Sequence, residues 1–361
     1  MKEKINSINS RQAGILVAIC LFANKMLLLP SLMFEQTKED SLFVLIFMFL
    51  LDIVVLPIFL NMKRKYPNEK LYNILASKIT PFFAKILYII FLVFFMLKVL
   101  LVFSITYVYF KQQIYQEELL FLILISCIPV INHAVCVGLR SLSRSIELLF
   151  GVVVGGVILC LFFSLFTNMS MPTFFVSSGK DFLLSVYKNA FSFGDYLLLF
   201  ILIDKIKINK NEEKKIYAFS LFGILLVVLL FLIFYSKYNV TAFMHNSALA
   251  DILTFSVQFN AIGRLDILAM VLIMTITLFQ LEIFAYCFCD VFSNIFTKFN
   301  KNYAVVIFDI TFILLYFSSF GKYENLLNSY QYWGPILGIF INYIFPLICL
   351  LIVLCKRKVK K

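Results

Sequence analysis

One stretch decides how this chain folds: Ala13-Gly14-Ile15-Leu16-Val17-Ala18-Ile19-Cys20-Leu21-Phe22-Ala23-Asn24-Lys25-Met26-Leu27-Leu28-Leu29-Pro30. It begins as an apolar membrane helix and is interrupted by Asn24 and Lys25, with Pro30 just beyond. A cation at the depth of the bilayer centre costs at least ~2.5 kcal/mol, so Lys25 should face protein or water. A polar break of this kind is typical of discontinuous helices that line a transporter site. The alternative is a continuous helix from which Lys25 extends its amine to the membrane surface.

The composition indicates a membrane protein. Hydrophobic residues make up 62% of the 361 residues, charged residues make up 14%, and 43 residues are Phe. The eight cysteines fall mostly within apolar runs, so we expect apolar fillers rather than disulfides. Cys287 and Cys289 have no second pair and no neighbouring His, which argues against a metal site. Because the chain also lacks a phosphate loop, a zinc-protease motif and a nucleophile elbow, we expect no catalytic residues, no enzymatic activity and no cofactor.

Ten hydrophobic runs are long enough to cross about 30 Å of hydrocarbon. They span residues 13–33, 41–62, 86–110, 117–135, 146–167, 185–204, 216–236, 265–294, 303–320 and 331–355. We therefore predict an all-α polytopic membrane protein, with residues 1–361 forming a single membrane domain in the lipid bilayer. The first run is expected to act as an uncleaved signal anchor.

The basic residues predict the orientation of the chain. Most of the 32 Lys and Arg residues lie before the first run, in every second loop, and after the tenth run. By the positive-inside rule, both termini are predicted to be cytoplasmic. Topology thus explains the net charge of +12, with anionic lipid as its neighbour, and we expect no nucleic-acid partner.

Ten spans divide into five and five, so the second half would start from the opposite side of the membrane. This arrangement predicts an inverted repeat over about 11–167 and 185–355, inferred from topology alone. The sixth run is also interrupted near its middle, at Phe191-Ser192-Phe193-Gly194-Asp195. We therefore predict that helices 1 and 6, the first helix of each half, are both discontinuous.

Charged side chains within the predicted helices should pair with one another. At ~1.5 Å per helical residue, Lys25 and Asp195 lie ~13 and ~15 Å below the outer ends of their helices. Since these depths agree, we predict a Lys25–Asp195 pair, or a ligand that bridges the two. The alternative is a permanent pair that only holds helix 1 to helix 6.

A second pair is predicted for Lys98, either with Glu282 or with Asp52. Lys98 and Glu282 each lie ~18 Å from the inner ends of their helices. Thr275 and Glu282 share a helix face by their i+7 spacing, and this face could line the site. A polar stripe between packed helices is the alternative. The outer loop 237–264 is expected to form a lid.

Several short segments carry a resemblance to one family. In chain order they are Ile8-Asn9-Ser10-Arg11-Gln12, Leu28-Leu29-Pro30, Lys65-Tyr66-Pro67-Asn68, Gly138–Glu147, Phe193-Gly194-Asp195, Gly263-Arg264-Leu265-Asp266 and Trp333-Gly334-Pro335. The chain resembles, over nearly its whole length, the B-subunit family of spore germinant receptors, the GerAB-like permeases of the amino acid–polyamine–organocation superfamily. Arg140, Ser143 and Ile146 depart from the family pattern. The resemblance implies a LeuT-type fold.

The resemblance also implies a ligand site between helices 1, 3, 6 and 8. Its expected residues are Ala23, Asn24, Lys25, Phe193, Gly194, Asp195, Thr275 and Glu282. In the superfamily, an unwound Gly-x-Gly segment holds a ligand carboxylate, but here Ala23-Asn24-Lys25 takes its place. Without glycines the ligand cannot approach the backbone as closely. Lys25 is therefore expected either to bind an anionic ligand or to fill the pocket.

These features lead to a main hypothesis, a subunit of a spore germinant receptor that senses a nutrient such as an amino acid. The missing glycines and the buried charges favour sensing over pumping. The resemblance implies A-type and C-type receptor subunits as partners, and the bacterial cytoplasmic membrane, here the spore inner membrane, as the location. The alternatives are a proton- or cation-coupled amino acid permease, with Asp52, Asp195 and Glu282 as proton carriers, and a subunit with only a scaffolding role.

Overall fold

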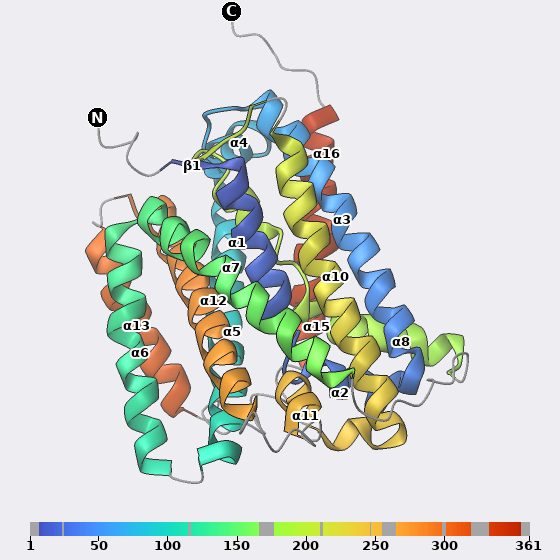
Figure 1. Ribbon diagram of the computed structural model, residues 1–361. Coiled ribbons are helices and arrows are strands. Elements are labelled where there is room, and N and C mark those ends of the chain that lie inside the picture. Colours follow the sequence, from blue (N-terminus) through green and yellow to red (C-terminus); the bar gives the residue numbers. More distant parts are fainter. Residues whose placement is uncertain are drawn as a thin grey trace, which may run out of the picture.

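The computed structural model describes residues 7–23, 25–114, 117–165, 177–209, 212–245, 247–254, 265–297, 301–318 and 332–354. These residues form a bundle of helices and, within the described ranges, one pair of two-residue strands (Figure 1). The elements are β1 (Ile8–Asn9), α1 (Ser10–Ala23), α2 (Leu29–Thr37), η2 (Lys38–Asp40), α3 (Ser41–Lys65), α4 (Leu71–Lys78), α5 (Pro81–Ile114), α6 (Glu117–Val137), α7 (Leu139–Ser164), α8 (Gly179–Asn189), η3 (Ala190–Ser192), α9 (Leu197–Ile201), β2 (Ile206–Lys207), α10 (Glu213–Tyr238), η4 (Asn239–Met244), α11 (Ala248–Thr254), α12 (Leu265–Ile295), α13 (Lys301–Phe317), α15 (Gly334–Ile339), η6 (Phe340–Ile344) and α16 (Phe345–Leu354).

Several helices have the length and apolar composition of membrane spans. Among the described residues, six qualify: Ser41–Lys65, Pro81–Lys111, Leu139–Ser164, Glu213–Met244, Ile267–Ile295 and Gly334–Leu354. Shorter apolar stretches of helix are Ser10–Ala23, Cys127–Val137 within α6 and Asn302–Phe317 within α13. The protein is therefore an all-α membrane protein. The other predicted runs are helical as well: the first and sixth runs are divided into shorter helices, and the fourth and ninth runs form α6 and α13.

Two predicted spans are broken in the structure. The first run forms α1, which ends at Ala23, and α2, which begins at Leu29. Pro30 lies in the first turn of α2, where a missing backbone N–H does no harm. The sixth run forms α8, the short 3₁₀ turn η3 and then α9, with residues 193–196 between η3 and α9. Asn24 lies outside the described residues.

Helix α1 lies in the interior and is buried on all sides except at Arg11 (Figure 1). It packs along α10, and glycines allow the two backbones to approach. A Cβ atom at Gly14 would lie 3.2 Å from the Cα of Ile216, and one at Gly223 would lie 3.2 Å from the Cα of Ala18. A helix surrounded by protein needs no polar face, which explains why α1 is apolar all round.

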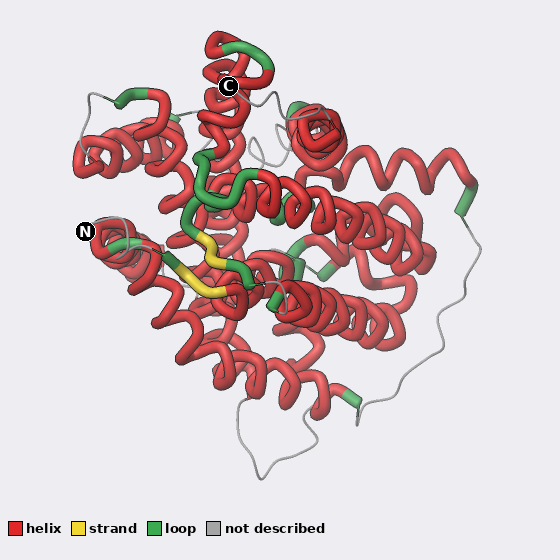
Figure 2. The backbone as a smooth tube through the Cα atoms, turned by 90° about the horizontal axis from the view of Figure 1, so that it is seen from above, coloured by secondary structure: helices red, strands yellow, loops and turns green. Residues whose placement is uncertain are grey.

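Strands β1 and β2 pair in parallel, with Ile8 opposite Ile206, at the end of the bundle that Figure 2 shows from above. The C-terminal end of α16 lies at this same end (Figure 1), where the Lys65 Nζ donates to the Val353 carbonyl over 2.6 Å. Both described ends of the chain therefore lie on one side of the molecule.

Ion pairs join the helices at the β1–β2 end. Arg11 Nε lies 3.1 Å from Glu147 Oε1. Arg64 pairs with Glu213, and Lys205 pairs with Asp290. The segments rich in Lys and Arg therefore contribute to contacts between helices as well as to net charge.

The cysteines behave as the sequence predicts within the described residues. Seven lie within the described residues, and all of these except Cys136 are buried. They form no disulfide within the part of the chain that the structure describes.

Candidate functional site

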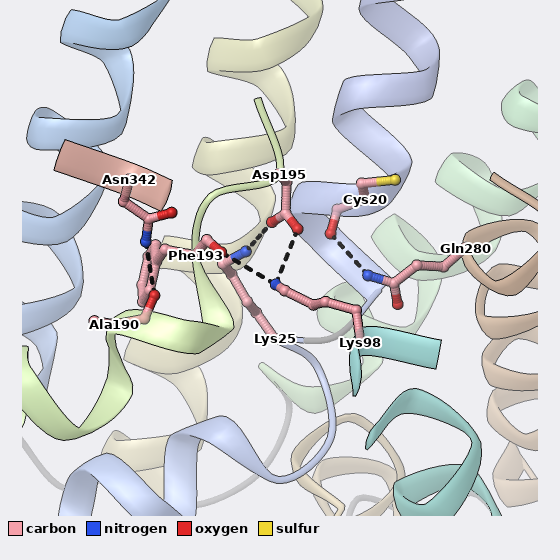
Figure 3. A network of polar contacts seen from close by, with 8 residues as sticks. All are labelled: Cys20, Lys25, Lys98, Ala190, Phe193, Asp195, Gln280 and Asn342. Carbon is pink, nitrogen blue, oxygen red and sulfur yellow. Dashed lines mark hydrogen bonds and ion pairs between the residues drawn. The ribbon is translucent and has the colours of Figure 1, made fainter. Parts of the chain in front are cut away.

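The two helix breaks meet at a buried group of charges (Figure 3). Lys25 Nζ lies 2.6 Å from Asp195 Oδ2, and Lys98 Nζ, from α5, lies 3.3 Å from Asp195 Oδ1. All three side chains are 0% exposed. We call Lys25, Lys98 and Asp195 the charged triad. Intramembrane charges of this kind mark functional sites by default, because burying them is so unfavourable.

Backbone and aromatic groups also stabilise the two lysines of the triad. Lys98 Nζ donates to the Phe193 carbonyl over 3.1 Å, a carbonyl that the break in the sixth run leaves available. Lys25 Nζ lies 4.8 Å from the ring centroid of Phe193 and 5.7 Å from that of Phe49. Cations in dry surroundings gain energy from aromatic faces in this geometry. The neighbourhood therefore suits fully desolvated cations.

The predicted Lys98–Glu282 and Lys98–Asp52 pairs are wrong, since Lys98 binds Asp195 instead. Among the described residues, Glu282 makes no hydrogen bond or ion pair. The prediction rested on matching depths, and depth along a helix does not define the direction in which a side chain points. Because the sixth run is broken, Asp195 lies where it can contact both lysines.

Thr275 stays apart from the triad. Its hydroxyl donates to the Val271 carbonyl over 2.8 Å, within its own helix α12. No hydrogen bond joins Thr275 or Glu282 to the triad within the described ranges. The i+7 spacing put these two residues on one face, but that face contributes no contact to the charged group.

Asp52 is the fourth buried charge of this region. It lies on α3, is 1% exposed, and is close to the backbone N–H of Gly194. Lys25 is the charged group that acts on it most strongly. The triad carries two cations and one anion, so Asp52 completes a set of two positive and two negative groups. Such a set avoids a net buried charge.

Gly194 shapes the break of the sixth run. Its φ of +86° lies in the left-handed region, which favours glycine. A Cβ atom at this position would lie 1.9 Å from Asn342 Oδ1. Asn342 also donates from Nδ2 to the Ala190 carbonyl over 2.7 Å (Figure 3). Asn342 therefore replaces part of the hydrogen bonding that the break removes.

Asn342 was not among the predicted site residues, although an amide near the middle of the tenth hydrophobic run was a usable signal. It lies in η6, a turn of π-helix within the last span. π-Helical turns insert one residue into a helix and frequently occur at functional sites. Here the inserted turn brings an amide to the break of another helix.

The break of the first run is closed by donors from two other helices. Gln280 Nε2, from α12, donates to the Cys20 carbonyl over 3.3 Å (Figure 3). The backbone N–H groups of Ala248 and Leu249, at the start of α11, donate to Leu27 and Met26 carbonyls over 3.2 and 3.1 Å. The outer loop expected as a lid therefore lies directly on the first break. Its residues 255–264 lie outside the described ranges.

Charged groups are present in this loop too. Asp251 Oδ2 lies 3.5 Å from His245 Nδ1 and accepts from the Ser247 N–H over 3.1 Å. Burial raises the pKa of the Asp251 carboxyl. The His245 carbonyl accepts a hydrogen bond from Ser31 of α2. The loop is thus hydrogen-bonded to the first break and to α2.

Ala23, Lys25, Phe193, Gly194 and Asp195 therefore meet where the two breaks meet, whereas Thr275 and Glu282 do not. In this structure Lys25 and Asp195 bond to each other, so the site is filled by its own side chains. A polar or charged small molecule could enter only by replacing part of these contacts. The arrangement can bind and discriminate charge.

Comparison with known proteins agrees with this picture. A family profile described as "Spore germination protein", the spore permease profile, matches residues 7–325. The match includes both breaks and all residues of the triad. A search of curated proteins finds no relative that matches. The chain therefore belongs to the spore permease family of spore germination proteins.

Proposed function

We propose that the protein is the ligand-sensing membrane subunit of a spore germinant receptor. The observation that carries this proposal is the charged triad, which joins the two broken helices through buried ion pairs. A small molecule with charged groups, such as an amino acid, would exchange its own charges for the Lys25–Asp195 contact. Ligand binding would then change how the two broken helices are held, and a sensor needs such a difference between two states.

The proposed architecture is a LeuT-type fold with ten spans. The inverted repeats would cover 11–167 and 185–355, with α1–α2 and α8–α9 as the equivalent broken helices. Three features support this assignment: the two breaks, their meeting at the triad, and the position of both described chain ends at one side. In this fold the β1–β2 end faces the cytoplasm, as the basic loops predict, and the membrane is the spore inner membrane.

The proposed partners are an A-type membrane subunit and a C-type lipoprotein of the receptor. The resemblance to B-type subunits supports this assignment. The departure from the superfamily pattern supports sensing: Lys25 stands where glycine would expose backbone donors, and its own backbone N–H donates to the Phe22 carbonyl over 3.3 Å. A transporter must release its ligand, whereas a sensor needs only to shift an equilibrium.

The test is a germination assay on spores that carry single substitutions. We expect Lys25→Gly and Asp195→Ala each to abolish the response to an amino acid that triggers wild-type spores. Lys180→Ala, at an exposed position on α8, serves as the control and should germinate normally. Membrane levels of each variant are measured by immunoblot, so that loss of protein is separated from loss of sensing. A normal response from both triad variants at normal protein levels would contradict the proposal.

A second function, proton-coupled amino acid transport, is favoured by the buried acids outside the triad. Glu282 is 5% exposed and lacks a partner among the described residues, as a proton carrier would between transfers. Uptake of labelled amino acids into proteoliposomes distinguishes the two functions. Uptake that is driven by a pH gradient, without any other receptor subunit, would support transport.

A further inference from the structure

A second polar site lies beside the triad. A cavity of about 10 Å³ is bordered by α3, the break of the sixth run, α9 and the π-helical turn η6. Asp52, Gly194, Tyr196 and Asn342 are among the residues that line it. A cavity of this volume can hold one water molecule.

Two polar atoms beside this cavity lack hydrogen-bond partners. Asp52 Oδ2 and Asn342 Oδ1 are buried, and neither has a hydrogen-bond partner among the described residues. Asp52 is 1% exposed and Asn342 is 2% exposed, whereas the Tyr196 hydroxyl lies beside Ser220 of α10. Two buried oxygen atoms without a donor beside one small cavity point to a missing occupant, because buried polar atoms are nearly always satisfied.

Donor counting restricts what the occupant can be. An ionised carboxylate oxygen and an amide oxygen can only accept, so Asp52 Oδ2 and Asn342 Oδ1 cannot satisfy each other. The occupant must therefore bring protons, as a water molecule does, or Asp52 must bind a proton itself.

We propose that this cavity holds a water molecule through which Asp52 binds and releases a proton, and that this proton controls the charge of the ligand site. The charged and titratable groups that act on Asp52 are Lys25, Lys98, Asp195, Tyr196 and Tyr343. With Asp52 ionised, the carboxylates of Asp52 and Asp195 balance the charges of Lys25 and Lys98. With Asp52 protonated, the triad keeps one positive charge in excess, which a carboxylate ligand neutralises.

Proton binding and ligand binding are therefore coupled. This part of the inference rests on the proposed function, since it takes an amino-acid-like carboxylate as the ligand. By linkage, a ligand that binds the protonated form better must itself promote protonation. The affinity for such a ligand rises by up to about tenfold for each unit that the pH falls.

Infrared spectroscopy tests the proton site without any ligand. The purified full-length protein in detergent is titrated with acid, and the stretch of a protonated carboxyl group is followed. We expect a band that wild type and Asp309→Asn share and that Asp52→Asn lacks. Asp309→Asn is the control because Asp309 is another partly buried acid, held by Asn132 outside this site. If wild type and Asp52→Asn give the same bands, the proton site is ruled out.

Calorimetry with L-alanine as the probe tests the coupling. In two buffers of different ionisation enthalpy, we expect wild type to take up about one proton for each ligand bound. Asp52→Asn should take up none and bind with an affinity that no longer changes with pH. Equal proton uptake in both proteins would overturn the coupling. A titrating Asp52 band in a protein that binds none of the standard amino acids would support the proton site and contradict the proposed function.

A metal ion is the competing occupant. Thermal unfolding midpoints are compared in sodium chloride and in choline chloride at constant ionic strength. We expect no difference between the two salts. A midpoint that rises with sodium in wild type but not in Asp52→Asn would show that the cavity binds sodium and would overturn the proposal.

Discussion

The two helix breaks differ in backbone conformation and in the groups that hydrogen-bond to them, although they meet at one site. The break after Ala23 contains no glycine, and donors from other helices close it: Gln280 of α12 and the backbone of α11. The break at Gly194 uses a left-handed glycine and is closed by Asn342 of η6. The first break contributes the cation Lys25, and the second contributes the anion Asp195.

The difference shows which group in each break determines the effect of a substitution. At the first break, the carbonyls of Cys20, Met26 and Leu27 already accept hydrogen bonds from other helices. The side chain of Lys25 is therefore the group that can exchange partners. In the second break the backbone conformation itself depends on one residue type. Substitutions should therefore act through charge at the first break and through both charge and backbone strain at the second.

The largest effect is expected for Asp195→Asn, which leaves two buried lysines without their anion. Removing one partner of a buried ion pair costs about 3–5 kcal/mol of folding free energy. The stability is measured by chemical unfolding in detergent micelles. Asp195→Asn combined with Lys98→Met should regain part of the loss, because fewer unpaired cations remain. If the single variant were as stable as wild type, the triad would not be an important contact between the breaks.

The next effect is expected for Gly194→Ala. Holding a non-glycine residue at a φ of +86° costs about 1–3 kcal/mol, and the collision with Asn342 adds to this. A double-mutant cycle with Asn342→Ala separates the two terms, since the second substitution removes the colliding oxygen but not the strain. Additive effects in that cycle would show that Asn342 does not limit the space at Gly194.

A smaller effect is expected for Lys25→Met, because Asp195 keeps its contact with Lys98. The lost charged hydrogen bond contributes about 1.5–3 kcal/mol. Thermal unfolding of purified protein measures the change. At the first break a loss of this size, together with a germination defect, would show that Lys25 acts through its charge. A loss as large as that of Asp195→Asn would mean that Lys98 alone cannot hold Asp195.

The smallest effect is expected for Gln280→Leu, which removes one neutral hydrogen bond to the Cys20 carbonyl. Such a bond contributes about 0.5–1.5 kcal/mol. Hydrogen exchange at residues 20–28 gives a local measurement, and protection there should fall while protection at residues 190–196 is unchanged. Equal loss of protection at both breaks would show that the two are closed as one unit.

The triad shows what can be predicted from the depth of a residue along its helix. Depth alone predicted that Lys25 and Asp195 lie at one level, and these residues are in contact. The same reasoning failed for Lys98 and Glu282, because Lys98 bonds Asp195 and the Phe193 carbonyl instead. Depth follows from counting residues, whereas the direction of a side chain depends on how each helix is rotated against its neighbours.

The sequence by itself determined the class of this protein and the positions of its breaks. A high content of apolar residues forces membrane helices, and a polar group within such a helix is tolerated only where protein surrounds it. Only the tertiary structure decided the partners: Lys98 with Asp195, Asn342 with Ala190, and Gln280 with Cys20. Each of these contacts joins residues far apart in the chain. Helix packing brings such residues together, and no local sequence pattern predicts which of the buried polar groups will be in contact.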